Sequence, residues 1–397
     1  MTGPGRNSGP KGIYLDYQAT TPTDPRVLEV MLPWFTERFG NPHSDAHAYG
    51  WDAEEAVERA RGDVAASLNA DPREIVFTSG ATESNNLAIK GAARFRRRHE
   101  GRDRVVTFQS EHKCVLESVR GLERDGFEVA VLPVRGDGLV ELQALRDALD
   151  ERTGLVSVMA VNNEIGVIQP LSEIAEAVHA VGAWLHVDAA QALGRIPLDV
   201  RVAGIDLLSL SGHKLYGPKG VGALYVRRRP RVRLEPLFDG GGQERGLRSG
   251  TLPTPLCVGL GEACRIAVTE LPREDERLAG LRDAFLAALQ ARLGPVQING
   301  SLQARVSGNL NLCFPGAPAD KVMAAARGVA VSTGSACSSA TVEPSYVLRA
   351  LGMSDEAAAC SLRIGFGRMT TLEEVARAAD LLASAVVTVR AGAAAAE

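Results

Sequence analysis

From Glu74 onward, short apolar runs alternate with amphipathic stretches, a pattern that predicts a sheet built from βα units. Fully apolar runs such as VSVMAV predict strands covered on both faces, as in a mostly parallel sheet. The predicted strands are 75–78, 105–108, 129–133, 156–161, 184–187, 207–210 and 221–226. Apolar residues at helical spacing predict helices over 52–68, 83–98, 113–125, 141–149 and 171–181.

After about Leu260 the pattern changes to a longer helix over 275–293, then short strands and a final helix over 372–389. We therefore predict an α/β chain with a large domain, 12–260, and a smaller α+β domain, 261–390. The N-terminal segment is a candidate to join the smaller domain. The two ends, 1–11 and 391–397, are rich in Gly, Pro or Ala and are predicted to be flexible.

Composition narrows the functional class. The chain has 397 residues and a net charge of −4, which gives no support to binding of nucleic acid, and we expect none. Six cysteines without a CxxC pair favour neither a disulfide framework nor a zinc site, so no metal is predicted. No apolar run approaches the roughly 20 residues that cross a bilayer, and the N-terminus does not resemble a secretory signal. We expect a cytoplasmic protein without a membrane span.

Polar residues follow several predicted strands, where ligands of an open parallel sheet bind. The run ending at Phe77 continues into Thr78-Ser79-Gly80-Ala81-Thr82-Glu83 and then a helix, so free backbone N–H groups meet a positive helix end. This pattern predicts a phosphate cradle, although Gly-Ala-Thr is also an ordinary strand-to-helix turn.

Asp188 and Lys214 follow two further strands. Each alone is better explained by a structural role, Asp188 as a helix N-cap and Lys214 as a solvated turn residue. Together with an anion cradle they indicate pyridoxal phosphate, because that cofactor needs a lysine for a Schiff base and an acid at its ring nitrogen.

Three more residues are candidates for chemistry. His112, after the strand ending at Phe108, can stack on a planar ring or move protons. Arg363 follows apolar sequence and can hold a substrate carboxylate, or form a structural ion pair. Cys337 lies in a run of small residues that predicts a mobile surface loop with an accessible thiol, whereas the other five cysteines, Cys114, Cys257, Cys264, Cys313 and Cys360, are predicted to be small core residues.

The chain resembles a known family through motifs that extend from Tyr14 to Val375. They include YLDYQATTPTDPRV, FGNPHS, EIVFTSGATESNN, EHKCVLES, VNNEIGV, HVDAAQALG, SGHKLYGPKGVGALYVRRRPRVR, GGGQERGLRSGT and STGSACSSATVEPSYVLRALG. These motifs are similar to those of cysteine desulfurases of the iron–sulfur cluster assembly type, which belong to the class V aminotransferase family. The resemblance implies fold type I of the pyridoxal-phosphate enzymes and the cofactor pyridoxal 5'-phosphate.

The resemblance also implies roles for single residues. Lys214 holds the cofactor as an internal aldimine and Cys337 attacks the sulfur of L-cysteine, which leaves L-alanine and a persulfide for a sulfur-acceptor protein that assembles clusters or thiolates tRNA. Arg363, helped by Asn163, fixes the substrate carboxylate. The implied cofactor-binding residues are Ala81, Thr82, His112, Asn163, Asp188, Gln191, Ser211, His213, Lys214 and Thr251, with Thr251 reaching in from the other subunit of a homodimer.

Two alternatives stay open. An aminotransferase or β-lyase of the same fold would need Lys214 and Asp188 but no nucleophilic Cys337. A dimeric interaction platform with reduced catalysis is a second alternative. The residue at 239 is Asp where many relatives have His, and the Trp-rich C-terminal extension of the family is not present in this sequence, so we expect docking to a cluster scaffold to differ from the familiar manner.

Overall fold

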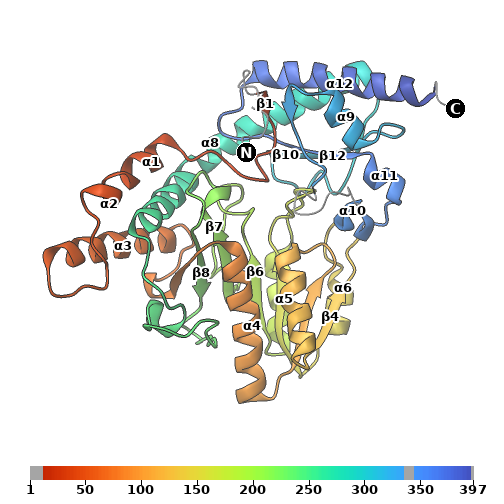
Figure 1. The fold of residues 1–397 in the computed structure, drawn as a ribbon. Helices are drawn as coiled ribbons and strands as arrows, with labels where there is room; N and C mark the ends of the chain where they lie inside the picture. Colours follow the sequence, from red (N-terminus) through yellow and green to blue (C-terminus); the bar gives the residue numbers. More distant parts are fainter. Residues whose placement is uncertain (1–11, 335–343, 395–397) are drawn as a thin grey trace, which may run out of the picture.

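The computed structural model describes residues 12–334 and 344–394. Its centre is a seven-stranded sheet in the order β2-β8-β7-β6-β5-β3-β4 (Figure 1). The strands are β2 (Ile75–Thr78), β3 (Arg104–Phe108), β4 (Glu128–Leu132), β5 (Thr153–Met159), β6 (Trp184–Asp188), β7 (Leu207–Ser211) and β8 (Gly222–Val226). Each lies within about three residues of its predicted position. The neighbours from β7 to β4 pair in parallel, whereas β8 pairs antiparallel with both β7 and β2.

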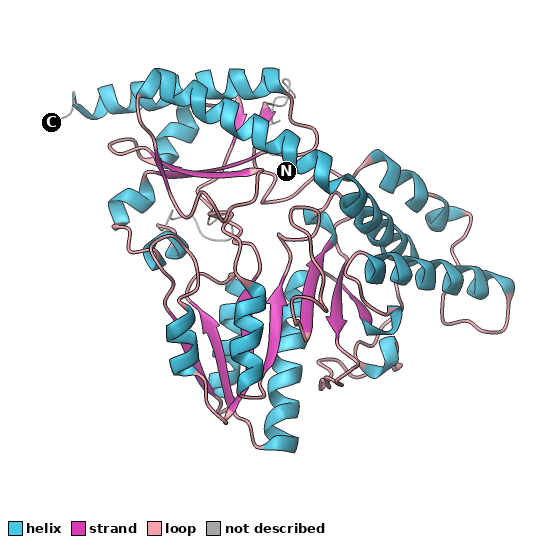
Figure 2. Cartoon of the chain, turned by 180° about the vertical axis from the view of Figure 1, so that it is seen from behind, coloured by secondary structure: helices cyan, strands magenta, loops and turns pink. Residues whose placement is uncertain are grey.

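Helices lie on both faces of this sheet (Figures 1 and 2). All residues of β2, β5, β7 and β8 are buried, which is why their sequences are almost continuously apolar. The helices of this part are α1 (Pro25–Met31), α2 (Pro33–Thr36), α3 (Ala48–Ala66), α4 (Ala81–Glu100), α5 (Lys113–Arg124), α6 (Leu142–Ala148) and α7 (Leu171–Ala180). Short 3₁₀ turns lie at η1 (Pro72–Glu74), η2 (Gly212–Lys214) and η3 (Glu244–Gly246).

A second, smaller core packs around an antiparallel sheet in the order β12-β10-β9. Its elements are β1 (Ile13–Tyr14), β9 (Gln297–Ile298), β10 (Asn309–Cys313), β11 (Val329–Ala330), β12 (Ser361–Gly365), α9 (Ala319–Ala325) and α12 (Leu372–Ala394). Helices α10 (Tyr346–Ala350) and α11 (Asp355–Ala359) precede β12 in the chain, but their buried side chains pack in the large core. Ile13 and Leu15 belong to this core, and β1 pairs in parallel with β11. The N-terminal segment is therefore packed with C-terminal residues.

One helix joins the two cores. Helix α8 (Thr254–Leu293) is forty residues long and begins 21 residues before the helix predicted over 275–293. Its residues up to Ile266 pack in the large core, and those from Leu281 onward pack in the small one. The domain limit predicted at 260 lies inside this continuous helix, so we keep the two-domain division as a prediction.

The first four residues of the segment 391–397 are helical, and flexibility of this end stays a prediction. Helix α12 continues to Ala394, because the apolar stripe that packs on the small core leads into an Ala-rich stretch, and alanine has the highest helix propensity. The other predicted end, 1–11, lies outside the described residues. Among the helices of the described chain, none is long and apolar enough to span a membrane.

Candidate active site

A cavity of about 540 Å³ opens beyond the carboxyl ends of the parallel strands, between the two cores. Most of the predicted site residues line it, although they come from distant parts of the chain. They are Ala81, Thr82, His112, Asn163, Asp188, Gln191, Ser211, His213, Lys214 and Arg363. Thr251 is exposed and does not contribute to the wall of this cavity, and Cys337 lies outside the described residues.

One end of the cavity is shaped for an anion. Helix α4 begins at Ala81 directly after β2, and no side chain caps its N-terminus. Gly80 precedes it with φ 147° and ψ 180°, a conformation that is essentially restricted to glycine. A Cβ at Gly222 would lie only 2.6 Å from the Gly80 Cα atom, so β8 and this turn are too close for any residue but glycine at position 222. The open N-terminus of α4 therefore presents backbone N–H groups and a positive helix end to the cavity.

Lys214 lies on the cavity wall at the end of η2, directly after β7. Its Nζ atom donates to the backbone oxygens of Gln18 and, at 2.9 Å, of Ala19. Burial lowers the pKa of the Lys214 amine to about 7, with further contributions from the positive charges of Arg195 and Arg363. A large share of this amine is therefore unprotonated, and nucleophilic, near neutral pH.

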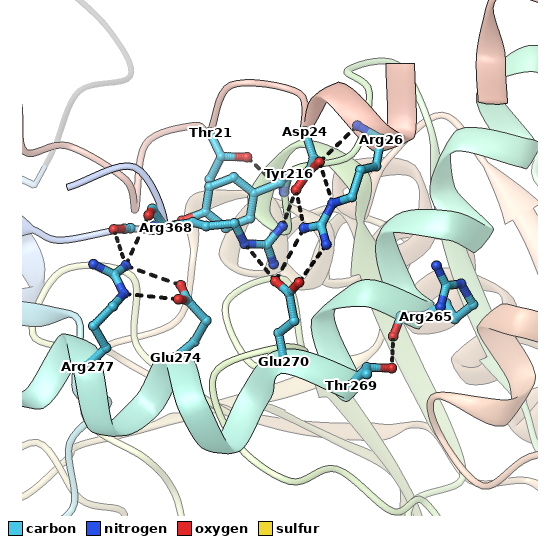
Figure 3. Close-up of polar contacts among 11 residues, drawn as sticks. Thr21, Asp24, Arg26, Tyr216, Arg265, Thr269, Glu270, Glu274, Arg277 and Arg368 are labelled. Carbon is cyan, nitrogen blue, oxygen red and sulfur yellow. Dashed lines mark hydrogen bonds and ion pairs between the residues drawn. The ribbon is translucent and has the colours of Figure 1, made fainter. Parts of the chain in front are cut away.

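The turn that carries Lys214 is held by an ion-pair network on α8 (Figure 3). Tyr216, with φ 63°, receives a hydrogen bond from the Arg368 backbone N–H at 2.6 Å, and the Arg368 guanidinium lies 4.3 Å from its ring centroid. Arg368 also pairs with Asp24 at 2.6 Å and with Glu270 at 3.4 Å. Arg26, and then Arg368, hold the pKa of Asp24 well below its usual range. The network therefore fixes the position of the lysine-bearing turn relative to α8.

Asp188 and His112 face the cavity from β6 and from the start of α5. The Asp188 Oδ1 atom accepts the Ala190 backbone N–H at 3.0 Å. His112 is the N-cap of α5, and its Nδ1 atom accepts the Cys114 backbone N–H at 3.2 Å. Burial lowers the pKa of His112, so the imidazole is neutral at pH 7 and its proton lies on Nε2.

Arg363 approaches the cavity from β12, in the small core. Its Nη1 atom donates to the Asn163 backbone oxygen at 2.8 Å, and its Nη2 atom pairs with Asp16 at 2.7 Å. The buried Nε atom of Arg363 and Oδ1 atom of Asn163 have no hydrogen-bond partner within the described part of the chain. Buried polar atoms without partners are costly, and here they indicate the place of a polar ligand.

Gln191 and His213 lie on the wall with their side chains already engaged. Gln191 donates to the Gln18 backbone oxygen at 2.8 Å and accepts from Arg195. The His213 Nδ1 atom lies 3.0 Å from the Thr20 hydroxyl, and burial lowers the pKa of His213 to about 4. His213 is therefore a neutral group that can donate or accept a hydrogen bond without adding charge.

The prediction that Cys114 is a core residue holds only in part, because this residue packs against the core on one side and lines the cavity on the other. Its thiol is half-buried on the cavity wall, 3.0 Å from His112 Nδ1, because the capping turn at His112 directs the first residues of α5 toward the ligand side. The cysteines at 257, 264, 313 and 360 are buried, as predicted.

Glu164 was not predicted as a site residue, yet it lies on the cavity wall and is only 1% exposed. Burial raises its pKa to about 7, and its carboxyl accepts a hydrogen bond from the Ser345 hydroxyl. A Cβ at Gly334 would lie 2.5 Å from Glu164 Oε2. The signal in the sequence was its place directly after Asn163 at the end of an apolar run.

Comparison with known proteins agrees with this site. The family model of aminotransferase class-V matches residues 13–378, so the chain belongs to the class-V aminotransferase family. That family uses pyridoxal 5'-phosphate, which confirms the predicted cofactor. The residues of the cavity fit this cofactor. A lysine with a lowered pKa, a buried carboxylate and the uncapped N-terminus of α4, which follows Gly80, all lie on the wall of one cavity.

Individual relatives indicate which class of enzyme within this family the chain resembles. A cysteine desulfurase IscS from Rickettsia bellii is 54% identical over 94% of this chain and 91% of its own length, and one from Rickettsia akari is equally similar. Among solved structures, a NifS-like protein matches with a TM-score of 0.88 at 36% identity, covering 95% of this chain and 100% of that chain. DndA from Streptomyces lividans matches with a TM-score of 0.75 at 44% identity, covering 87% and 97%. Within its family, the chain belongs with the cysteine desulfurases.

Proposed function

We propose that this protein is a pyridoxal-phosphate-dependent cysteine desulfurase, which converts L-cysteine to L-alanine and passes the sulfur through Cys337 to an acceptor protein. One observation carries the proposal. The Lys214 amine, with its pKa lowered to about 7, lines the same cavity as Arg363, whose buried Nε atom has no hydrogen-bond partner within the described residues. A solved relative described as SspA in complex with cysteine, 41% identical, supports the substrate.

The residues of this chain then have definite tasks. Lys214 supplies the amine that binds the cofactor and, when the substrate amine replaces it, takes the α-proton as a neutral base. Arg363 binds the substrate carboxylate through its Nε–H, which lacks a partner, and the amide N–H of Asn163 helps. The Asn163 Oδ1 atom, which also lacks a partner, can only accept a hydrogen bond from the ligand. The bound cofactor supplies an electron sink for the charge left on the α-carbon.

Asp188 and His112 hold the cofactor ring from two directions. Asp188, at the end of β6, would pair with the ring nitrogen and keep it protonated. His112 would lie against the ring face, and its Nε2 proton is free for donation because Nδ1 accepts the helix N–H of Cys114. Ala81, Thr82, Ser211 and His213 hold the phosphate at the start of α4.

Cys337 is the proposed sulfur acceptor. Its thiolate attacks the substrate sulfur, the carbon–sulfur bond breaks, and the electron pair stays with the alanine carbon, so the sulfur remains on Cys337 as a persulfide. Gly334, three positions earlier in the sequence, lies on the cavity wall, and this supports a role for the following segment at the site.

We also propose a homodimer, with Thr251 contributing to the cavity of the second subunit. Large apolar side chains are exposed along α1, α2 and α3 and the segments that join them, which favours burial against another chain. The most exposed are Leu32, Phe35, Phe39, Tyr49 and Trp51. The acceptor protein, for cluster assembly or tRNA thiolation, and the cytoplasm as location remain predictions.

Two variants test the proposal. Purified protein with pyridoxal phosphate should absorb in the visible range and release alanine from L-cysteine, and Lys214→Ala should lose both properties. Cys337→Ser should retain the visible band but lose cysteine-dependent turnover. Full turnover by Cys337→Ser would favour an aminotransferase or β-lyase, and partner binding without any alanine would favour an interaction platform.

A further inference from the structure

Asn85 is a fully buried polar residue that none of the roles above includes. It lies at the fifth position of α4, on the side that faces β6, and its side chain is 0% exposed. Both hydrogens of its amide nitrogen are used. The Nδ2 atom lies 2.7 Å from Asp188 Oδ2 and 3.1 Å from Cys114 Sγ. Asn85 therefore connects the end of β6 with the start of α5.

The first contact fixes the Asp188 carboxylate. Its Oδ1 atom accepts the Ala190 backbone N–H, and its Oδ2 atom accepts the Asn85 amide. Two donors, one on each oxygen, determine the plane of the carboxylate. Without the Asn85 donor, Oδ2 would lose the hydrogen bond on the side away from Ala190.

The second contact reaches His112 through a thiol. The Cys114 Sγ atom lies 3.0 Å from His112 Nδ1, which already accepts the Cys114 backbone N–H and so carries no proton. Burial raises the pKa of the Cys114 thiol to about 12, so the thiol keeps its proton, and its S–H group shares the Nδ1 lone pair with the backbone N–H as a second hydrogen-bond donor. The hydrogen bonds run from Asn85 to Asp188 on one side, and from Asn85 through the Cys114 thiol to His112 on the other.

We propose that Asn85 is a positioning residue, whose amide sets the carboxylate plane of Asp188 and, through the Cys114 thiol, the ring orientation and tautomer of His112. The Asn85 amide thus aligns Asp188, at the edge of the cofactor ring, with His112, at the face of the ring. This inference rests on the proposed function, because these two alignments matter only when a cofactor ring lies between the residues.

The experiment compares Asn85→Ala and Asn85→Leu with Asn86→Ala, a half-buried neighbour on the same helix whose amide donates to the Thr82 backbone oxygen. Each cofactor-free protein is titrated with pyridoxal phosphate, and the pH midpoint of the visible band is then measured on the loaded protein. We expect both Asn85 variants to bind the cofactor about tenfold to 100-fold more weakly, as for loss of a hydrogen bond to a buried charge. Asn86→Ala should bind as the unchanged protein does.

The midpoint separates positioning from packing. When Asp188 no longer holds the ring nitrogen protonated, the positive charge near the Lys214-linked nitrogen is lost, so the midpoint should move to higher pH in Asn85→Ala. The charged groups around the Lys214 amine are Arg195, Arg363, Asp16 and Asp188, and Lys113 and Glu111 lie near His112 and Cys114. The substitution replaces none of these side chains, so a moved midpoint reports a changed alignment of Asp188. If the space left by Asn85→Ala only loosens the packing, the cofactor should bind more weakly but the pH midpoint should not move.

Asn85→Leu has nearly the shape of the native side chain but no hydrogen-bond donor, and so protects the test against misfolding. If it binds the cofactor as tightly as the unchanged protein, or if Asn85→Ala leaves the midpoint where it was, the inference is wrong. A second pair, Cys114→Ser against Cys114→Ala, tests the link to His112, since only the hydroxyl can replace the thiol donor. Failure of the unchanged protein to bind pyridoxal phosphate would instead overturn the proposed function.

Discussion

The lowered pKa of Lys214 leads to a quantitative prediction about how the cofactor-free protein takes up pyridoxal phosphate. An ordinary lysine with a pKa near 10.4 is about 0.1% unprotonated at pH 7.5, whereas one with a pKa of about 7 is about three-quarters unprotonated. Because only the neutral amine attacks the aldehyde, the buried site should react several hundredfold faster than a free lysine at this pH, by the same arithmetic.

The assay is rapid mixing of cofactor-free protein with pyridoxal phosphate, followed through the visible band at pH values from 6 to 9. Since the Lys214 pKa is lowered, the amine loses its proton as the pH rises through about 7, so the rate should rise up to that region and then level off. A simple amine treated in the same way corrects for ionisation of the cofactor itself. A rate that still rises tenfold per pH unit between 8 and 9 would refute the reasoning, because Lys214 would then titrate as an ordinary lysine.

Three further predictions concern the cradle, the substrate and the core. Gly80→Ala should weaken cofactor binding by roughly 1–3 kcal/mol in an equilibrium titration, since its backbone is restricted to glycine, whereas Gly62→Ala, in open space on α3, should leave binding unchanged. Arg363→Lys should lower kcat/KM for L-cysteine about tenfold or more, and normal kinetics would exclude carboxylate binding at this residue. Arg61→Met should lower the free energy of unfolding, measured with urea, by about 3–5 kcal/mol, because it leaves Glu244 buried without its bidentate partner; an unchanged urea midpoint would contradict this.

The central sheet could be predicted because its strands are buried on both faces and therefore appear as apolar runs of strand length. The first half of α8 could not be predicted from the sequence. Its glycines suggest breaks, yet a Cβ at Gly261 would lie 2.8 Å from the Ala60 Cα atom, and one at Gly259 would lie 2.5 Å from the Met31 sulfur. These glycines permit close packing of helices, a tertiary cause that a single sequence does not reveal.

The site was predictable where polar residues directly follow strands, as for Asp188 and Lys214. Asn85 and Cys114 were missed, because both lie inside helices, where only the direction of the side chain decides whether it faces the cavity or the core. The motifs that carry the family resemblance supplied the remaining site residues, and local physical chemistry alone did not.

The cavity draws Lys214 from the large core and Arg363 from the small one. With the proposed roles, the large part of the chain holds the cofactor, whereas the amino acid is also held by Arg363 from the small part, and one long helix connects the two parts. Substitutions in the C-terminal third can retune substrate choice while leaving the prosthetic group seated, so a lineage could acquire a new amino-acid specificity without first rebuilding its catalytic base.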